Sequence, residues 1–98
     1  MAITFAPAAM QDLEEIGDYI HADNATAAFR FIRELRERCS RLADAPRGGA
    51  PRPEIWVGLR SVPFGRYVIF YTLAGDEVRI ERILHGSRDI GTVFTDDK

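Results

Sequence analysis

The sequence is short of cysteine, histidine and lysine, and it has no long apolar run. Cys39 is the only cysteine among 98 residues, which excludes a disulfide framework and a cysteine-based metal site. No stretch approaches the roughly 20 apolar residues of a membrane-spanning helix. The N-terminal residues lack a basic stretch followed by an apolar one, so no secretory signal is expected. These absences predict a soluble, cytoplasmic protein with no metal, cofactor or membrane partner.

Charge of either sign is not in large excess. The formal net charge is -2 and the isoelectric point is near 5.6, whereas a domain that coats nucleic acid usually has an isoelectric point above about 9. Lys98 is the only lysine, so every other basic residue is an arginine. Arginine holds carboxylates and phosphates through a planar fork, although a GC-rich genome would produce the same bias without any functional cause.

Two helical segments are expected after a short first strand. The partly β-branched "AITF" predicts a strand at residues 2–5. Apolar residues then recur at helical spacing after Pro7 and again after Asp23 or Asn24, either of which can cap the second helix. This predicts two antiparallel helices joined by a tight link. The expected buried stripes are Ala9, Leu13, Ile16 and Ile20 in the first helix, and Ala28, Ile32, Leu35, Cys39 and Leu42 in the second.

Three strand-like runs follow a loop rich in glycine and proline at residues 47–56. The runs "GLRSVPF", "RYVIFYTL" and "EVRIERILH" are separated by short turns and therefore predict an antiparallel meander. Both faces of the middle run are largely apolar, as in a central strand. In the last run Arg82 shares a face with Val78, Ile80 and Leu84. This break in alternation predicts either a bulge near Glu81 or an Arg82 that projects where no helix covers the sheet.

The expected fold is therefore α+β, a single domain over residues 1–98. An N-terminal strand and two antiparallel helices precede the three-stranded meander. The helices should cover one sheet face and leave the other partly open, and a polar tail should begin at about residue 90 and lack order when unbound.

Several sequence pieces occur in an order that resembles the toxins of the RelE/ParE superfamily. They are the helix "AAMQDLEEIGDYI", the helix end "LADAP", the strand starts "GLR" and "RYVIFY", and the ending "LHGSRD". The resemblance implies one half of a toxin–antitoxin pair. RelE-like members are ribonucleases that cut mRNA on the ribosome, whereas ParE-like members bind DNA gyrase and block it. Because the two groups share a fold, the site must decide between them.

RNA cleavage would require a base, an acid and cations for the phosphorane charge. If this chain were a nuclease, His85, Arg82 and Arg66 would be the candidates. Gly86, however, stands where the histidine-using nucleases of the family place a tyrosine, and no tyrosine follows His85. The ending "LHGSRD" resembles that of ParE-like members. The sequence therefore favours a gyrase-binding toxin without catalytic residues over the nuclease, with an inactive relative that only binds its antitoxin as a third possibility.

The candidate residues for binding the target or the antitoxin are polar groups of the strand region. Each also has a structural interpretation: Arg60 and Arg66 as solvated charges flanking the Gly65 turn, His85 bonded to a loop, and Arg88 paired with Asp89. The full set is Arg60, Arg66, Arg82, His85, Arg88 and Asp89.

The resemblance also implies a partner, an antitoxin of the ParD type. Such a protein has a dimeric DNA-binding N-terminal half and a C-terminal segment that folds on the toxin, so this chain would meet DNA only through it. An amphipathic helix of that segment could fill the groove beside the paired helices. Acidic and apolar anchors are expected on the segment, in a two-to-two or larger complex.

Overall fold

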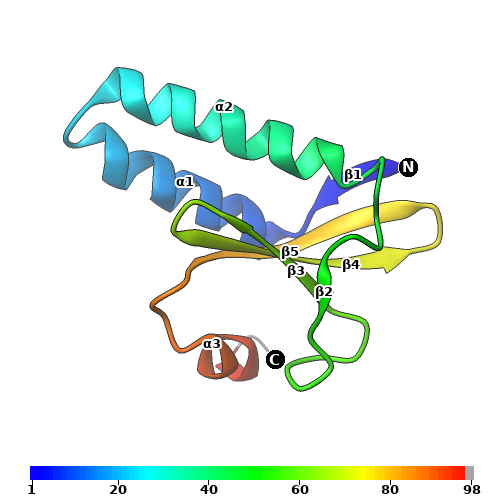
Figure 1. The fold of residues 1–98 in the computed structure, drawn as a ribbon. Coiled ribbons are helices and arrows are strands. Elements are labelled where there is room, and N and C mark those ends of the chain that lie inside the picture. Colours follow the sequence, from blue (N-terminus) through cyan, green and yellow to red (C-terminus); the bar gives the residue numbers. More distant parts are fainter. Residues whose placement is uncertain (97–98) are drawn as a thin grey trace.

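The computed structural model describes residues 1–96, and within them one mixed sheet carries helices on both faces (Figure 1). The chain order of the elements is β1 (Ala2–Phe5), α1 (Pro7–His21), α2 (Ala25–Arg41), β2 (Ala50–Pro51), β3 (Arg60–Phe64), β4 (Tyr67–Ala74), β5 (Glu77–His85) and α3 (Ile90–Asp96). The strand order across the sheet is β1-β5-β4-β3-β2. The expected strand, helix pair and antiparallel meander are confirmed.

The first strand joins the sheet beside the last one and runs parallel to it. Ala2 to Phe5 of β1 pair with Glu77 to Ile80 of β5. The chain leaves this edge at Ala6, whose amide donates to the carbonyl of Ile80 at 2.8 Å, and Pro7 then starts α1. Because β1 stops there, the second half of β5 has no strand on its outer side.

Helices α1 and α2 form a hairpin over one face of the sheet, called the helix face here (Figure 1). Asn24 caps α2, since its side chain accepts from the Ala27 amide at 3.0 Å. The predicted stripes are buried or half-buried and meet the inward side chains of the sheet, among them Ile69, Tyr71, Val78 and Ile80. This contact forms the main core of the molecule.

The opposite face, called the second face, is more covered than the sequence predicted, although a groove remains open on it. Leu59, Phe70 and Leu84 are buried there beneath α3 and the loop before β3. Ile90, Val93 and Phe94 supply the apolar side of α3. The expectation of a polar, unordered tail from about residue 90 is therefore wrong for α3, because its three apolar side chains find an apolar surface; Asp97 and Lys98 lie outside the described residues.

A bulge in β5 changes which side chains face the helices. Tyr71 pairs with Ile80, but Phe70 pairs with Arg82, so Glu81 is the extra residue. The predicted bulge near Glu81 is confirmed. Beyond it the faces exchange: Ile83 joins the main core and Leu84 joins the second face. The expectation that Leu84 shares a face with Val78 is wrong for this reason.

Two-residue turns connect the strands of the meander. Gly65 and Gly75 each hold a positive φ, 58° and 61°, at the first position of their turns. Glycine adopts this backbone conformation without steric cost, and such turns match the twist of paired strands. No helix in the described part of the chain has the length and apolar character needed to cross a membrane.

Candidate functional site

Arg82 lies in an ion pair beneath α1. Its Nε and one terminal nitrogen donate to the two carboxylate oxygens of Asp12 at 2.9 and 3.0 Å. The side chains of Asp12 and Arg82 are only 4% and 13% exposed. Asp12 also accepts from the backbone amide of Ile83 at 2.9 Å, on the side of β5 that β1 does not reach. The guanidinium expected on an open surface is thus bound within the fold, where it ties α1 to β5.

Arg60 also makes internal bonds. It lies at the end of β3 that pairs with Tyr71, whereas Gly65 lies at the other end, so the expectation that Arg60 flanks the Gly65 turn is wrong. Its guanidinium donates to the carbonyl of Arg47 at 3.0 Å and of Gly49 at 2.8 Å. These bonds fix the Gly- and Pro-rich loop against β3.

The buried hydroxyl of Tyr71 fixes the same loop. It accepts from the Gly49 amide at 2.9 Å and donates to the Pro46 carbonyl at 2.8 Å. A Cβ atom on residue 49 would lie 2.5 Å from this hydroxyl, so only glycine fits. The loop after α2 is therefore held by side-chain to backbone bonds, with only the two residues of β2 in regular structure.

Arg66 and His85 meet at one end of the helix face, in a space called the His85 cleft. The bulge brings His85 opposite Tyr67 in the β4–β5 register, and the two rings pack edge to face with centroids 5.3 Å apart. The cleft has a volume of about 340 Å³ and is lined by Tyr19, Ile20, Phe31, Arg66, Tyr67 and His85. Of the three residues proposed for a nuclease, Arg66 and His85 are thus brought together, whereas Arg82 is not.

The ring of His85 is held by its neighbours. The amide of Ser87 donates to Nδ1 at 3.1 Å, and the Ser87 hydroxyl lies 2.7 Å from the same nitrogen. Because Nδ1 accepts a hydrogen bond, the neutral ring carries its proton on Nε2. Burial raises the pKa of the Tyr67 phenol, and the nearby phenol of Tyr19 raises it further. Tyr67 is therefore a neutral hydroxyl at physiological pH.

Arg88 and Asp89 are exposed and do not form the expected pair among the described residues. Asp89 instead caps α3, with the Thr92 amide donating to Oδ1 at 3.3 Å and the Thr92 hydroxyl donating to Oδ2 at 2.7 Å. The side-chain and backbone bonds from Thr92 hold the pKa of Asp89 below its usual value. Asp89 thus has a local structural role, and Arg88 remains a surface cation.

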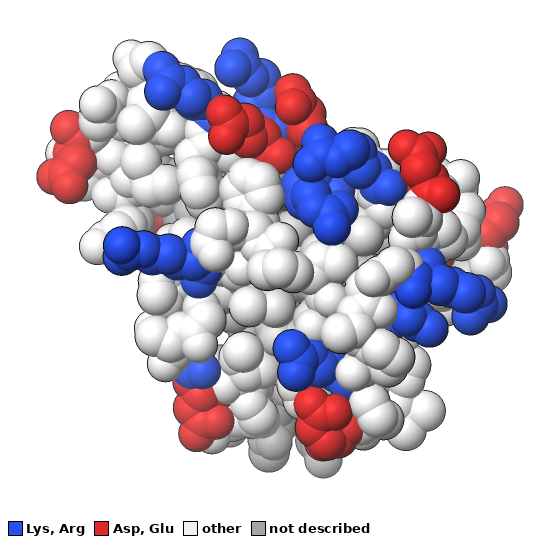
Figure 2. Space-filling view, in the orientation of Figure 1, with Lys and Arg blue, Asp and Glu red and all other residues white. Residues whose placement is uncertain are grey.

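A second groove follows the outer side of the helix hairpin, between α1 and α2. It has a volume of about 600 Å³, and Gly17 opens it because that position carries no side chain. Phe29 lies on its border and is 74% exposed. Charged side chains of both signs alternate along α2 above an uncharged middle of the same molecular face (Figure 2). The floor is apolar and the rim charged, an arrangement typical of grooves that bind amphipathic helices.

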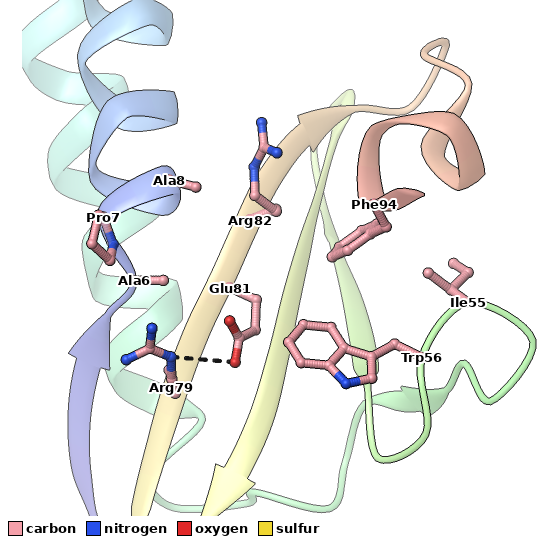
Figure 3. Close-up of a pocket in the computed structure, with 9 residues that line it drawn as sticks. All are labelled: Ala6, Pro7, Ala8, Ile55, Trp56, Arg79, Glu81, Arg82 and Phe94. Atoms are coloured by element: carbon pink, nitrogen blue, oxygen red, sulfur yellow. Dashed lines mark ion pairs between the residues drawn. The ribbon is translucent and has the colours of Figure 1, made fainter. Parts of the chain in front are cut away.

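The third groove lies on the second face and is drawn in Figure 3. Trp56 and Phe94 form one wall, and the start of α1 forms the other, with β5 between them. Glu81 lies at its base, where it accepts from the Thr72 hydroxyl at 2.7 Å and pairs with Arg79 at 3.4 Å. Its volume is about 560 Å³. The carboxylate is thus already neutralised by the chain itself.

Sequence reasoning missed Tyr19 and Tyr67 at the cleft, since it searched for a tyrosine only after His85. The antiparallel register, and not proximity in sequence, brings Tyr67 beside that ring. Among the side chains that the structure describes, which end at residue 94, no group of three or more histidine, cysteine, aspartate or glutamate residues could hold a metal ion. The arrangement offers hydrogen-bond donors and apolar grooves.

Comparisons with known proteins agree on the kind of protein. Residues 3–90 match the family described as the ParE toxin of the type II toxin–antitoxin system, parDE. The chain is 33% identical over 87 residues to toxin ParE1 of Mycobacterium tuberculosis, in strains CDC 1551 / Oshkosh and ATCC 25618 / H37Rv, with 87% of this chain and 89% of the relative covered. A solved chain of the chromosomal ParDE toxin–antitoxin system from P. aeruginosa superposes with a TM-score of 0.75 at 24% identity, over 87% of this chain and 95% of that one. The chain described here belongs to the ParE toxin family of type II toxin–antitoxin systems.

Proposed function

We propose that this toxin acts in the cytoplasm by binding DNA gyrase and blocking it, without making or breaking a covalent bond. The observation that carries the proposal is the chemistry of the second face. An RNA-cutting relative would place basic, histidine and tyrosine or glutamate side chains across that face. Here Leu59, Phe70 and Leu84 occupy it, beneath the aromatic side chain of Phe94. The part of this face beneath α3 is apolar and covered, and such a surface cannot stabilise a phosphorane.

The position of Arg82 supports the same conclusion. A guanidinium that already forms two hydrogen bonds to Asp12 has few donors left for a phosphate. Its release would leave Asp12 buried without its counter-charge, which is costly. Of the two arginines proposed for a nuclease, Arg82 is therefore bound to Asp12 and cannot join Arg66 in binding a phosphate.

Neutralisation would come from a ParD-type antitoxin, in a two-to-two or larger complex. The groove between α1 and α2 has the apolar floor and charged rim that suit an amphipathic helix of the antitoxin's C-terminal segment. Phe29→Ala should weaken antitoxin binding without destabilising the toxin, because the side chain is 74% exposed. Arg30→Ala, the next exposed position of α2 outside the groove lining, is the matched control.

A supercoiling assay with purified toxin and gyrase tests the target. We expect toxin in excess to inhibit supercoiling and the antitoxin to restore it when added first. Full supercoiling at toxin excess, together with codon-specific mRNA cuts in cells, would establish the ribosome-dependent nuclease instead. Neither effect, with antitoxin binding intact, would establish the inactive relative.

One observation favours the nuclease as the second candidate. His85, Arg66 and Tyr67 line one cleft, and they supply the residue types that RNA cleavage uses. If this cleft were catalytic, His85→Ala would abolish mRNA cleavage while the protein remained folded. Under the gyrase proposal, neither the unchanged chain nor His85→Ala should cut mRNA.

A further inference from the structure

The His85 cleft holds several hydrogen-bond donors and no acidic side chain. Its lining contains one charged residue, Arg66, which is exposed. Among the described side chains of residues 1–94, none forms a salt bridge or a hydrogen bond with the guanidinium of Arg66 or the hydroxyl of Tyr67. His85 adds its Nε2–H, since Nδ1 is taken by Ser87. Donors of this kind, one of them permanently cationic, suit an anionic acceptor.

The backbone of Arg66 and the rings of Tyr67 and His85 are held in place before any ligand arrives. Arg66 is the second residue of the tight turn after Gly65, and its carbonyl accepts from the Gly86 amide at 2.8 Å. This bond joins the β3–β4 turn to the end of β5. Tyr67 packs against both His85 and Phe31, with ring centroids 5.3 and 5.7 Å apart. Binding here would cost little ordering of the backbone and the rings.

The cleft and the groove between α1 and α2 share no lining residue, but both reach the same turns of α1, on different sides of that helix. Tyr19 and Ile20 line the cleft, while Gly17, Asp18 and His21 of the same helix turns line the groove. A peptide that leaves the groove at the end of the hairpin next to the α1–α2 link would therefore pass over Tyr19 into the cleft. The apolar rings of Phe31 and Tyr67 would contact the stem of a side chain entering there.

We infer that the His85 cleft binds a carboxylate side chain of the antitoxin segment that occupies the α1–α2 groove. The carboxylate would accept from Arg66 and from the neutral donors of Tyr67 and His85, and an apolar neighbour in the segment would pack on Phe31. The inference depends on the proposed antitoxin partner but not on gyrase as the target. It assigns a specificity role to the residues that sequence reasoning considered for catalysis.

A titration with short peptides tests the chemistry of the cleft. The probes are N-acetyl-leucyl-glutamyl-phenylalanine amide and its glutaminyl counterpart, added at millimolar concentration to the isotope-labelled full chain and followed by amide NMR. We expect the acidic peptide to shift the amides of Arg66, Tyr67 and His85, and the neutral peptide to shift them far less. Arg66→Gln should remove the difference, whereas Arg30→Gln, an exposed arginine of α2 outside the cleft, should keep it.

Two further arms separate the possible ligands. Equal shifts with both peptides would overturn the inference, as would tighter binding of inorganic phosphate or of a single-stranded RNA hexamer to the same amides. In the second arm the purified antitoxin is used, and Arg66→Gln should weaken its binding about tenfold. Unchanged antitoxin affinity would also overturn the inference. Failure of gyrase inhibition alone would leave both results standing and reject only the proposed target.

Discussion

The Asp12 carboxylate accepts three hydrogen bonds, two from the Arg82 guanidinium and one from the Ile83 amide. It replaces the strand that β5 lacks on its outer side by accepting the Ile83 amide, and it neutralises Arg82 at the same time. Nothing in the spacing of the sequence joins residue 12 to residue 82, so the pair could not be predicted. The apolar stripe around Asp12, in contrast, followed directly from helical periodicity.

Removing the carboxylate should destabilise the fold strongly. Asp12→Ala leaves Arg82 without its counter-charge at a side chain that is 13% exposed. Loss of one partner of a buried ion pair costs about 3–5 kcal/mol, a large part of the roughly 5–15 kcal/mol that stabilises a typical domain. Urea unfolding followed by circular dichroism measures the change in free energy of unfolding.

Arg79→Ala is the matched control, because its bond to Glu81 involves an arginine side chain that is 43% exposed. It should cost clearly less than Asp12→Ala, because water screens the exposed guanidinium and Glu81 keeps its hydrogen bond from the Thr72 hydroxyl. Equal losses in the two variants would contradict the structural role of Asp12. Arg82→Ala should also destabilise the fold strongly, because it leaves Asp12 buried without its counter-charge. Lost toxicity in that variant therefore does not identify a catalytic arginine.

Cys39 was predicted as a core residue, and its side chain is fully buried. Burial raises the pKa of the thiol to about 11, an effect that Arg38 and Arg36 partly oppose. The native thiol should therefore react very slowly with a disulfide reagent at pH 8, and at the ordinary rate once the chain is unfolded in urea. Rapid native reaction would show that α2 separates readily from the core.

The raised pKa of the Cys39 thiol should make the fold less stable at alkaline pH. The folded state favours the protonated thiol. The contribution of this thiol to the free energy of unfolding is therefore complete below its unfolded pKa of 9.0 and is lost as the pH rises towards the folded pKa of about 11. Cys39→Ala should remove this contribution to the pH dependence. Its free energy of unfolding, measured by urea titration at pH 8 and pH 10.5, should change less between the two conditions than that of the unchanged chain.

Among the elements, periodicity predicted both long helices, and turn residues predicted the meander. The parallel partner of β1 was not predictable, because pairing of residues more than 70 positions apart leaves no local pattern. The bulge was inferred from Arg82, yet its consequence was not. The bulge at Glu81 places His85 opposite Tyr67. If the strands instead kept the register of the Tyr71–Ile80 pair, Leu84 would lie opposite Tyr67. The candidate site therefore depends on one register shift.

Helix α3 was missed because it is short and its C-terminal neighbours are polar. Its cap is Asp89, whose depressed pKa means that the carboxylate form is the one bonded to Thr92. The stability that this cap gives to α3 is complete above 3.8, the ordinary pKa of the carboxyl group, and is lost as the pH falls through its lower pKa in the folded chain. Asp89→Ala should loosen α3 at neutral pH as well.

Trp56 is the only tryptophan and reports this change directly, since its ring centroid lies 6.2 Å from that of Phe94. We expect Asp89→Ala to shift Trp56 emission towards that of a solvated indole, while far-ultraviolet circular dichroism changes little. Asp89→Asn is the matched control, because asparagine caps helices about as well as aspartate. An unchanged emission spectrum in Asp89→Ala would mean that the cap does not hold α3 in place.

Across the whole molecule, the sheet separates two cores of unequal size. The helix-face core contains thirteen buried residues, which come from α1, α2, the adjoining Ala6 and Leu42, and the three strands β3, β4 and β5, whereas the second-face core contains Leu59, Phe70 and Leu84. Since stabilisation scales with the apolar area buried, the second core should contribute much less. Local opening in proteins follows such differences in burial. The two sides of the sheet should therefore open at different free energies.

Hydrogen exchange of the full chain measures this difference. Amides of Ile69 and Tyr71, in the central strand, should exchange only through global unfolding, whereas the Val93 amide, bonded to the Asp89 carbonyl at 3.2 Å, should exchange through local release of α3. Leu59→Ala, at a side chain that is 1% exposed, should lower protection of Val93 first, because it removes part of the surface on which α3 packs. If Val93 and Ile69 exchanged with the same opening free energy, the two cores would form one cooperative unit. Helix α3 would then be held as firmly as the helix hairpin, and a partner would bind without rearrangement only in spaces that are already open, such as the α1–α2 groove, the His85 cleft and the groove beside Trp56.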